Sequence, residues 1–332
     1  GKVYPVSGSP IEHGTVLIRN GKIVAVGANV DIPSDAQRVD ASGKWVTPGL
    51  IDPATQLALV EVGFGADANE SRAKTSDAIA ADFTSWDGIN PRSVLVAPAR
   101  EDGITSVMAL PEGGLIAGQA AMIDLYGTSR ADMLVKAPAV MVGQLGNDQA
   151  AGAGAKGQVV AKMRALLEDA RFYEKHKTDF DRAETRGLSA NRGSLDAMVA
   201  VVDGKLPLLI EADQAADIQS AIDLAKQFDI KVIIGGGAEA WEVADKLAAA
   251  RIPVIAGAMM NIPSSFDALG SRQDNVALLR KAGVEVALMG NAGGGDEELF
   301  NVRNIRYEAG NAVAYGMSWD DALRAITEAP AQ

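Results

Sequence analysis

Eight short apolar runs, separated by polar and amphipathic stretches, constrain the fold of this chain more than any other feature of its sequence. A short apolar run followed by a helical pattern is typical of a buried strand in a βα unit, and repeated units build a parallel sheet. Eight units fit a (β/α)8 barrel, whose functional groups gather at the carboxyl ends of the strands. The predicted strands are Leu50–Gln56, Ile104–Leu110, Ala120–Tyr126, Ala137–Leu145, Leu206–Ala212, Lys231–Gly235, Ile252–Ala258 and Val284–Gly290.

Amphipathic periodicity predicts helices between these strands, most clearly in the second half of the chain. The clearest predicted helices are Gln158–His176, Ala215–Phe228, Ala240–Ala250 and Asp274–Ala282. The predicted fold class is therefore α/β, with a TIM-like barrel over residues 48–332.

Residues 1–47 have a different pattern, with short strands and turn residues. Gly14–Arg19 and Lys22–Gly27 flank Asn20-Gly21, a dipeptide that suits a type I′ turn because both positions tolerate a positive φ. A further strand is expected around Gln37–Trp45. These features predict a small β-sandwich domain over residues 1–47, which precedes the barrel.

Composition excludes several functional classes. A formal net charge of −12 and a pI near 4.7 argue against a nucleic-acid partner and against anionic membrane surfaces. The sequence contains no run of eighteen apolar residues, so no membrane insertion is expected. It contains no cysteine, which excludes disulfides and thiolate zinc sites. The abrupt start at Gly1, without an initiator Met, slightly favours an exported or periplasmic protein over a cytoplasmic one.

The sequence contains only two histidines, His13 and His176. His13 lies in a turn between two early strands, and His176 lies at the charged end of a predicted helix. Both are expected on the surface. A zinc site built on histidines cannot be assembled from this inventory.

The segment Pro48-Gly49-Leu50-Ile51-Asp52 resembles the opening of the first barrel strand in the metal-dependent amidohydrolases. Four further motifs are similar to the imidazolonepropionase-like branch of that superfamily: Gly113–Gln119, Lys136–Asn147, Glu239-Ala240-Trp241 and Arg306–Ala312. The resemblance implies the same barrel and hydrolysis of C–N bonds other than peptide bonds. It also implies that C-terminal strands complete the small sandwich, so the natural chain is expected to continue beyond Gln332.

The resemblance also implies six metal-ligand positions, at none of which this chain has the family residue. The first-strand histidines fall on Ala54 and Gln56, the bridging lysine on Val142, the fifth- and sixth-strand histidines on Glu211 and Gly236, and the eighth-strand aspartate on Asn291. A methyl group cannot bind a metal, and a carboxamide is a weak ligand for zinc. Zinc is therefore not expected as a cofactor, although a hard cation on carboxylates remains an open alternative.

The remaining polar residues at the predicted strand ends form the candidate site. Glu211, Asp213 and Asn291 are the candidate catalytic residues, and Gln56, Gly236 and Glu239 are the candidate substrate-binding residues. Glu211, Gln56 and Asn291 are expected to converge in a hydrogen-bonded polar floor. Two plainer interpretations stay open: Glu211 paired with a basic neighbour, and Asp213 as a helix N-cap.

Three functions follow from these observations. The first, and the favoured one, is a degenerate amidohydrolase (a pseudoenzyme) that retains a small-molecule pocket without zinc hydrolysis. The second is an active C–N hydrolase that uses Glu211, Asp213 and Gln56 directly or through a hard ion. The third is a non-catalytic structural subunit. A homo-oligomer, or an assembly with an active homologue, is the expected partnership.

Overall fold

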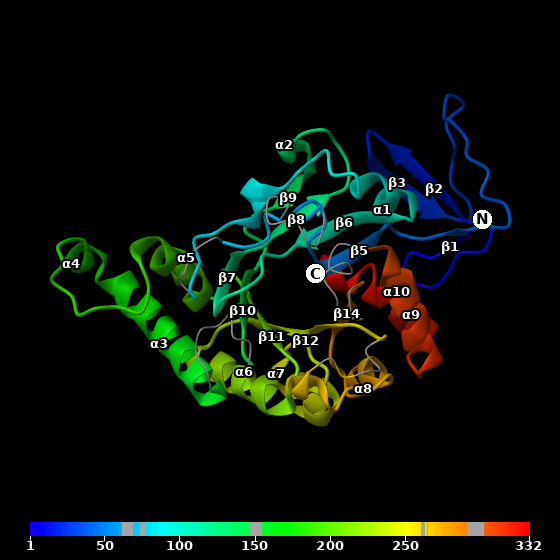
Figure 1. The fold of residues 1–332 in the computed structure, drawn as a ribbon. Helices are drawn as coiled ribbons and strands as arrows, with labels where there is room; N and C mark the ends of the chain where they lie inside the picture. The colour runs from blue at the N-terminus through cyan, green and yellow to red at the C-terminus, as the bar shows by residue number, and fades with distance from the viewer. Residues whose placement is uncertain (62–68, 74–77, 147–154, 260–262, 264, 291–301) are drawn as a thin grey trace.

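The computed structural model describes residues 1–61, 69–73, 78–146, 155–259, 263, 265–290 and 302–332. Figure 1 shows the strands of the central and C-terminal parts grouped together, with helices packed around their outer side. The barrel strands are β5 (Leu50–Thr55), β6 (Ile104–Ala109), β7 (Ile116–Gln119), β8 (Ala121–Asp124), β10 (Met141–Gln144), β11 (Leu208–Ala212), β12 (Val232–Gly236), β13 (Val254–Ala256) and β14 (Val286–Leu288).

These strands form two sheets that share one extended segment. The first sheet has the order β14-β13-β12-β11-β10-β7, and the second has the order β5-β6-β8 followed by β9 (Leu134–Lys136). Only Ala120 separates β7 from β8, and its backbone is hydrogen-bonded to Ala139 and Val140, so the segment from β7 to β8 joins the two sheets. At the other side β14 contacts β5, where the Gly290 amide donates to the Asp52 carboxylate at 3.0 Å. The predicted barrel is therefore confirmed.

The third barrel strand runs antiparallel to its neighbours. The prediction that all eight strands are parallel was therefore wrong at this strand. β7 pairs antiparallel with β10, and β8 pairs antiparallel with β6. The reason is the connection from β6, because residues 110–115 are too few for the crossover that a parallel return needs. Gly113 and Gly114, at φ 92° and 70°, reverse the chain instead.

The helices mostly follow the predicted positions. The predicted helix at Ala240–Ala250 begins as a 3₁₀ turn and becomes α-helical at Ala244. The helices are α1 (Val96–Glu101), α2 (Arg130–Met133), α3 (Lys156–Lys175), α4 (Lys177–Asp181), α5 (Arg192–Val202), α6 (Ala215–Phe228), α7 (Ala244–Ala250), α8 (Asn275–Lys281), α9 (Ile305–Ala314) and α10 (Trp319–Ala325).

Two apolar clusters fill the molecule, one on each side of the barrel wall. The larger cluster packs the strands against the surrounding helices and includes Ile210, Ile234 and Val254. The smaller cluster fills the inside of the barrel and includes Leu209 and Ile255. Neighbouring residues such as Leu209 and Ile210 belong to different clusters because side chains alternate across a strand.

Residues 1–47 form two small sheets. β1 (Lys2–Val3) pairs with β4 (Trp45–Val46), and β2 (Thr15–Arg19) pairs with β3 (Lys22–Gly27). The hairpin turn is the predicted one, since Asn20 and Gly21 have φ of 53° and 73°. The strand expected around Gln37–Trp45 was placed wrongly, because strand structure there begins only at Trp45.

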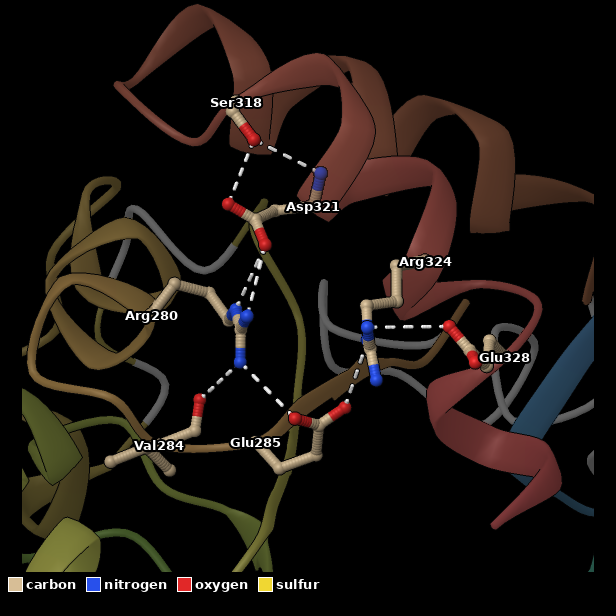
Figure 2. A network of polar contacts seen from close by, with 7 residues as sticks. All are labelled: Arg280, Val284, Glu285, Ser318, Asp321, Arg324 and Glu328. Atoms are coloured by element: carbon tan, nitrogen blue, oxygen red, sulfur yellow. Dashed lines mark hydrogen bonds and ion pairs between the residues drawn. The ribbon is translucent and has the colours of Figure 1, made fainter. Parts of the chain in front are cut away.

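Ion pairs between side chains hold the C-terminal helix α10 at the amino end of β14 (Figure 2). Arg280 donates to Asp321 at 2.9 Å, to the Val284 carbonyl at 2.8 Å and to Glu285 at 3.2 Å. Arg324 donates to the other oxygen of Glu285 at 3.4 Å. Each carboxylate in this network therefore contacts at least one guanidinium, which holds α10 against α8 and β14.

Candidate functional site

A cavity of about 560 Å³ opens at the carboxyl ends of the barrel strands. This size lies within the usual range for small-molecule sites. Its lining comes from β5, β10, β11 and β12 and from the segments that follow β6, β13 and β14. The lining residues are Ala54, Leu110, Gln144, Leu145, Gly146, Leu209, Glu211, Ala212, Asp213, Gly235, Gly236, Ser265, Phe266, Asp267 and Met289.

The floor of this cavity is apolar. Ala54, Leu110, Leu209 and Met289 line it, and all four belong to, or pack against, the cluster inside the barrel. Val142, another predicted ligand position, is 1% exposed within the same cluster. Packed alkyl groups therefore occupy the level of the barrel at which the resemblance placed metal ligands.

Glu211 and Asp213 both line the cavity, so the structure brings together two of the predicted catalytic residues. Glu211 is the fourth residue of β11 and lies beside Gly235 in the register, so its side chain follows that of Leu209 on the inner face. Asp213 comes directly after the strand. The N-cap of α6 is Gln214, so the alternative interpretation of Asp213 as that N-cap is wrong.

The backbone fixes the position of the Asp213 carboxylate. Its Oδ1 accepts a hydrogen bond from the Ala238 amide at 3.2 Å, and its carbonyl accepts one from the Glu239 amide at 2.8 Å. Gly236, which also lines the cavity, has a φ of 81°, and a Cβ there would lie 2.6 Å from the same Oδ1. Any larger residue at position 236 would therefore displace the carboxylate, so the glycine at this predicted ligand position makes room for Asp213.

The charged groups that act on Asp213 are mainly acidic. Burial raises the pKa of Asp213, and the nearby carboxylates of Asp267, Glu239 and Asp217 raise it further. Lys156, the first residue of α3, contacts Asp267 at 2.8 Å, and it also donates to Asp217 and Gln214. This lysine compensates part of the negative charge, although it is not among the lining residues.

Asp267, Phe266 and Lys156 were not predicted from the sequence as site residues. Asp267 and Phe266 lie in a short 3₁₀ turn after β13, and Lys156 begins a helix after β10. Their grouping depends on where two separate segments, the turn after β13 and the start of α3, lie at the barrel mouth, and the sequence carries no local signal for this. Only the general rule that loops after barrel strands carry function pointed to these segments.

Gln56 is not among the residues that line the cavity, so its predicted grouping with Glu211 is wrong. Gln56 is the residue after β5, and its carbonyl accepts from the Leu59 and Val60 amides in a turn that takes the chain out of the barrel. Its side chain is hydrogen-bonded to Glu112. Burial opposes ionisation of Glu112, but hydrogen bonds from Arg72, Gln56 and Ser71 lower the pKa of that carboxyl overall.

Glu239, another candidate, holds two segments of backbone together and does not line the cavity. The Glu239 carboxylate accepts from the Ala215 and Gly270 amides, both at 2.9 Å, so it joins the start of α6 to the turn at Gly270. Its side chain is not a lining residue. Asn291 lies outside the described residues.

The donors present do not fit a zinc ion. Ala54, Val142 and Gly236 have no side-chain donor, and within the described ranges no group of three His, Cys, Asp or Glu residues is arranged to hold a metal ion. His13 is exposed, and His176 stacks on Phe172 and contacts Asp179 at 3.2 Å. Neither histidine lines the cavity, and His13 lies on the surface as predicted, whereas His176 is half-buried.

A scan against protein-family models finds no match to this chain. A segment of 50 residues is 50% identical to an imidazolonepropionase from Bradyrhizobium diazoefficiens, and it covers 14% of this chain and 12% of that protein. A segment of 54 residues is 52% identical to an imidazolonepropionase from Geobacillus kaustophilus, and it covers 14% of this chain and 13% of that protein. The matched segments therefore span only about an eighth of these relatives.

The similarity to a solved structure extends over the whole chain. An amidohydrolase from Thermotoga maritima superimposes with a TM-score of 0.87 at 27% identity, over 99% of this chain and 86% of that one.

Among the helices that the structure describes, none has the length and apolar character needed to cross a bilayer.

Proposed function

Because this chain belongs to the amidohydrolase superfamily and is imidazolonepropionase-like, we propose that it is a degenerate member of that superfamily. In this proposal the barrel keeps a small-molecule pocket at its carboxyl end. It does not hydrolyse C–N bonds through zinc.

The apolar interior of the barrel carries this proposal. Ala54, Val142 and Leu209 lie in one packed cluster with Ile255 of β13 and Ala287 of β14. A divalent ion placed among these side chains would lose its hydration and gain few ligands, and burial of an uncompensated charge costs many kcal/mol.

The consequence for chemistry is large. A catalytic metal lowers the pKa of its bound water from about 15.7 to about 7. That change of roughly nine units corresponds to on the order of 12 kcal/mol of nucleophile activation. Glu211 or Asp213 could act as a general base, but general base catalysis typically accelerates a reaction only about 10²–10⁴-fold. It could not replace the activation of water by a metal.

One observation favours a second candidate, an active C–N hydrolase with a carboxylate site. Glu211 and Asp213 line the same cavity, and two adjacent carboxyl groups can share acid and base roles or hold a hard cation. Gln56, the third residue of that hypothesis, is turned towards Glu112.

Elemental analysis and hydrolysis assays of the purified protein test these proposals. If the chain is a degenerate enzyme, the purified protein should contain far less than one equivalent of zinc. It should also show no hydrolysis of cyclic or linear amides that is stimulated by zinc or abolished by EDTA. Stoichiometric zinc that supports turnover would contradict this proposal. Turnover that needs Mg²⁺ or Mn²⁺ and is lost in Glu211→Gln would favour the second candidate. Glu101→Gln is the matched control, because Glu101 is exposed at the end of α1, before β6.

A further inference from the structure

We propose that the cavity binds a small organic cation that has an apolar body, and that the Asp213 carboxylate is its counterion. The inference rests on the proposed role of the cavity as a small-molecule pocket. It adds the chemical class of the ligand, which neither the fold nor the relatives specify.

The charged side chains that line the cavity are acidic. Among the residues that the structure describes, Glu211, Asp213 and Asp267 line the cavity, and no lysine, arginine or histidine does. Lys156 reaches Asp267 from outside the lining, and it is shared with Asp217. Several carboxylates around a concave, partly desolvated space produce a negative potential that attracts cations and repels anions.

Asp213 is the carboxylate placed best to meet a ligand. One of its oxygens is held by the Ala238 amide, and no ion pair involves Asp213 within the described part of the chain. Gly236 provides the space in which this carboxylate lies. The acceptor is therefore fixed before any ligand arrives, so binding would cost little reorganisation.

The apolar surface of the cavity determines the rest of the ligand. Leu110, Leu145, Leu209 and Met289 offer a surface for an alkyl or aryl group, and Phe266 lines the cavity with 82% of its surface exposed. A bare inorganic cation would leave this surface hydrated, because hard divalent ions require six or more oxygen ligands. An ammonium group on an apolar body fits both parts of the lining.

Three probes of similar shape test the inference: benzylammonium, benzyl alcohol and benzoate, titrated at pH 7.5 and low ionic strength by calorimetry or ligand-observed NMR. Benzylammonium should bind roughly tenfold or more tightly than benzyl alcohol, and benzoate should bind more weakly than either. Asp213→Asn should remove most of the preference for the cation and leave benzyl alcohol binding nearly unchanged. Salt should weaken only the binding of benzylammonium.

Asp223→Asn is the matched control, since Asp223 is an exposed residue of α6 and does not line the cavity. It should keep the preference of the wild type. Equal binding of the three probes, tighter binding of benzoate, or an unchanged preference in a folded Asp213→Asn variant would overturn the inference. Metal-dependent turnover would contradict the degenerate-enzyme proposal alone, because the preference for a cation is measured without metal or catalysis.

Discussion

The two ends of the barrel use charge in opposite ways. At the amino end of β14, Glu285 lies between Arg280 and Arg324, and Asp321 contacts Arg280 (Figure 2). At the carboxyl ends of the strands, carboxylates surround a cavity to which the described residues contribute no basic side chain. In barrels the first end serves stability and the second carries function. The comparison supports the proposal that the acidic cavity binds a ligand, because it lies at the end of the barrel where functional groups gather.

The largest expected effect concerns Asp52, which lies between the two ends. It is fully buried and accepts from the Ala54 and Gly290 amides, both at 3.0 Å. Burial raises the pKa of Asp52 from 3.8 to about 7, despite those hydrogen bonds. A folded pKa above the unfolded one means that the native state binds more protons between these values. Protonated Asp52 therefore stabilises the native state. This stabilisation is fully present below about pH 4 and is lost as the pH rises through about 7.

We therefore expect the free energy of unfolding of Asp52→Asn, minus that of the wild type, to rise by on the order of 4 kcal/mol between pH 4 and pH 8. Denaturant unfolding at several pH values measures this difference, with Asp223→Asn as the control for the loss of one exposed charge. A difference that stays flat, or falls with pH, would show that Asp52 is ionised at low pH in the native state.

At the carboxyl end, Gly236→Ala should reduce the free energy of unfolding by about 3 kcal/mol. Part of this loss comes from a side chain at positive φ, roughly 1–2 kcal/mol, and the rest from displacement of the Asp213 carboxylate. Gly204→Ala separates the two parts, because Gly204 has a φ of 68° and a Cβ there would meet nothing within 4 Å. Equal losses in both variants would mean that Gly236 does not position Asp213.

The sequence predicted the barrel well because that architecture depends on local patterns. The limits of α6 agree with the predicted helix, and β11 and β12 lie within a residue or two of their predicted bounds. Alternation along β11 also placed Glu211 correctly on the inner face. The reversed third strand was missed because β7 and β8 have the same apolar pattern as a parallel strand, and only the short connection after β6 sets their direction.

The site was predicted less well, since it depends on where the chain leaves each strand. Gln56 was assigned to the cavity because it falls on a first-strand ligand position of the resembling family, but the chain turns directly after β5. Asp267 and Lys156 come from loops whose approach to the barrel mouth no periodicity describes. The sequence predicted a polar floor of Glu211, Gln56 and Asn291, whereas the floor that the structure describes is apolar. It includes Ala54, and Val142 lies in the same apolar cluster.

At the amino end, Arg280→Met should reduce the free energy of unfolding by about 2 kcal/mol, because Asp321 and Glu285 lose a partly buried partner. The loss should become smaller at high salt. Arg92→Met is the control, since Arg92 is exposed and should give a change below about 0.5 kcal/mol. Ligand affinity at the other end should be unaffected. A loss of affinity without global unfolding would show that the two ends are coupled.

The smallest and most selective effect concerns Lys156, the cation that partly compensates the acidic cavity. Lys156→Met removes its contacts with Asp267 and Asp217, and we expect a loss of roughly 1 kcal/mol in stability. The same change makes the cavity more negative, so benzylammonium should bind roughly threefold to tenfold more tightly at low ionic strength. Lys175→Met, on the exposed last turn of α3, should change neither quantity measurably. The free energy of unfolding would then fall while the affinity for benzylammonium rises. Opposite changes of this kind distinguish charges that bind a ligand from charges that stabilise the fold. Weaker binding of benzylammonium in Lys156→Met would instead mean that Lys156 orders the cavity wall more than it compensates the field inside it.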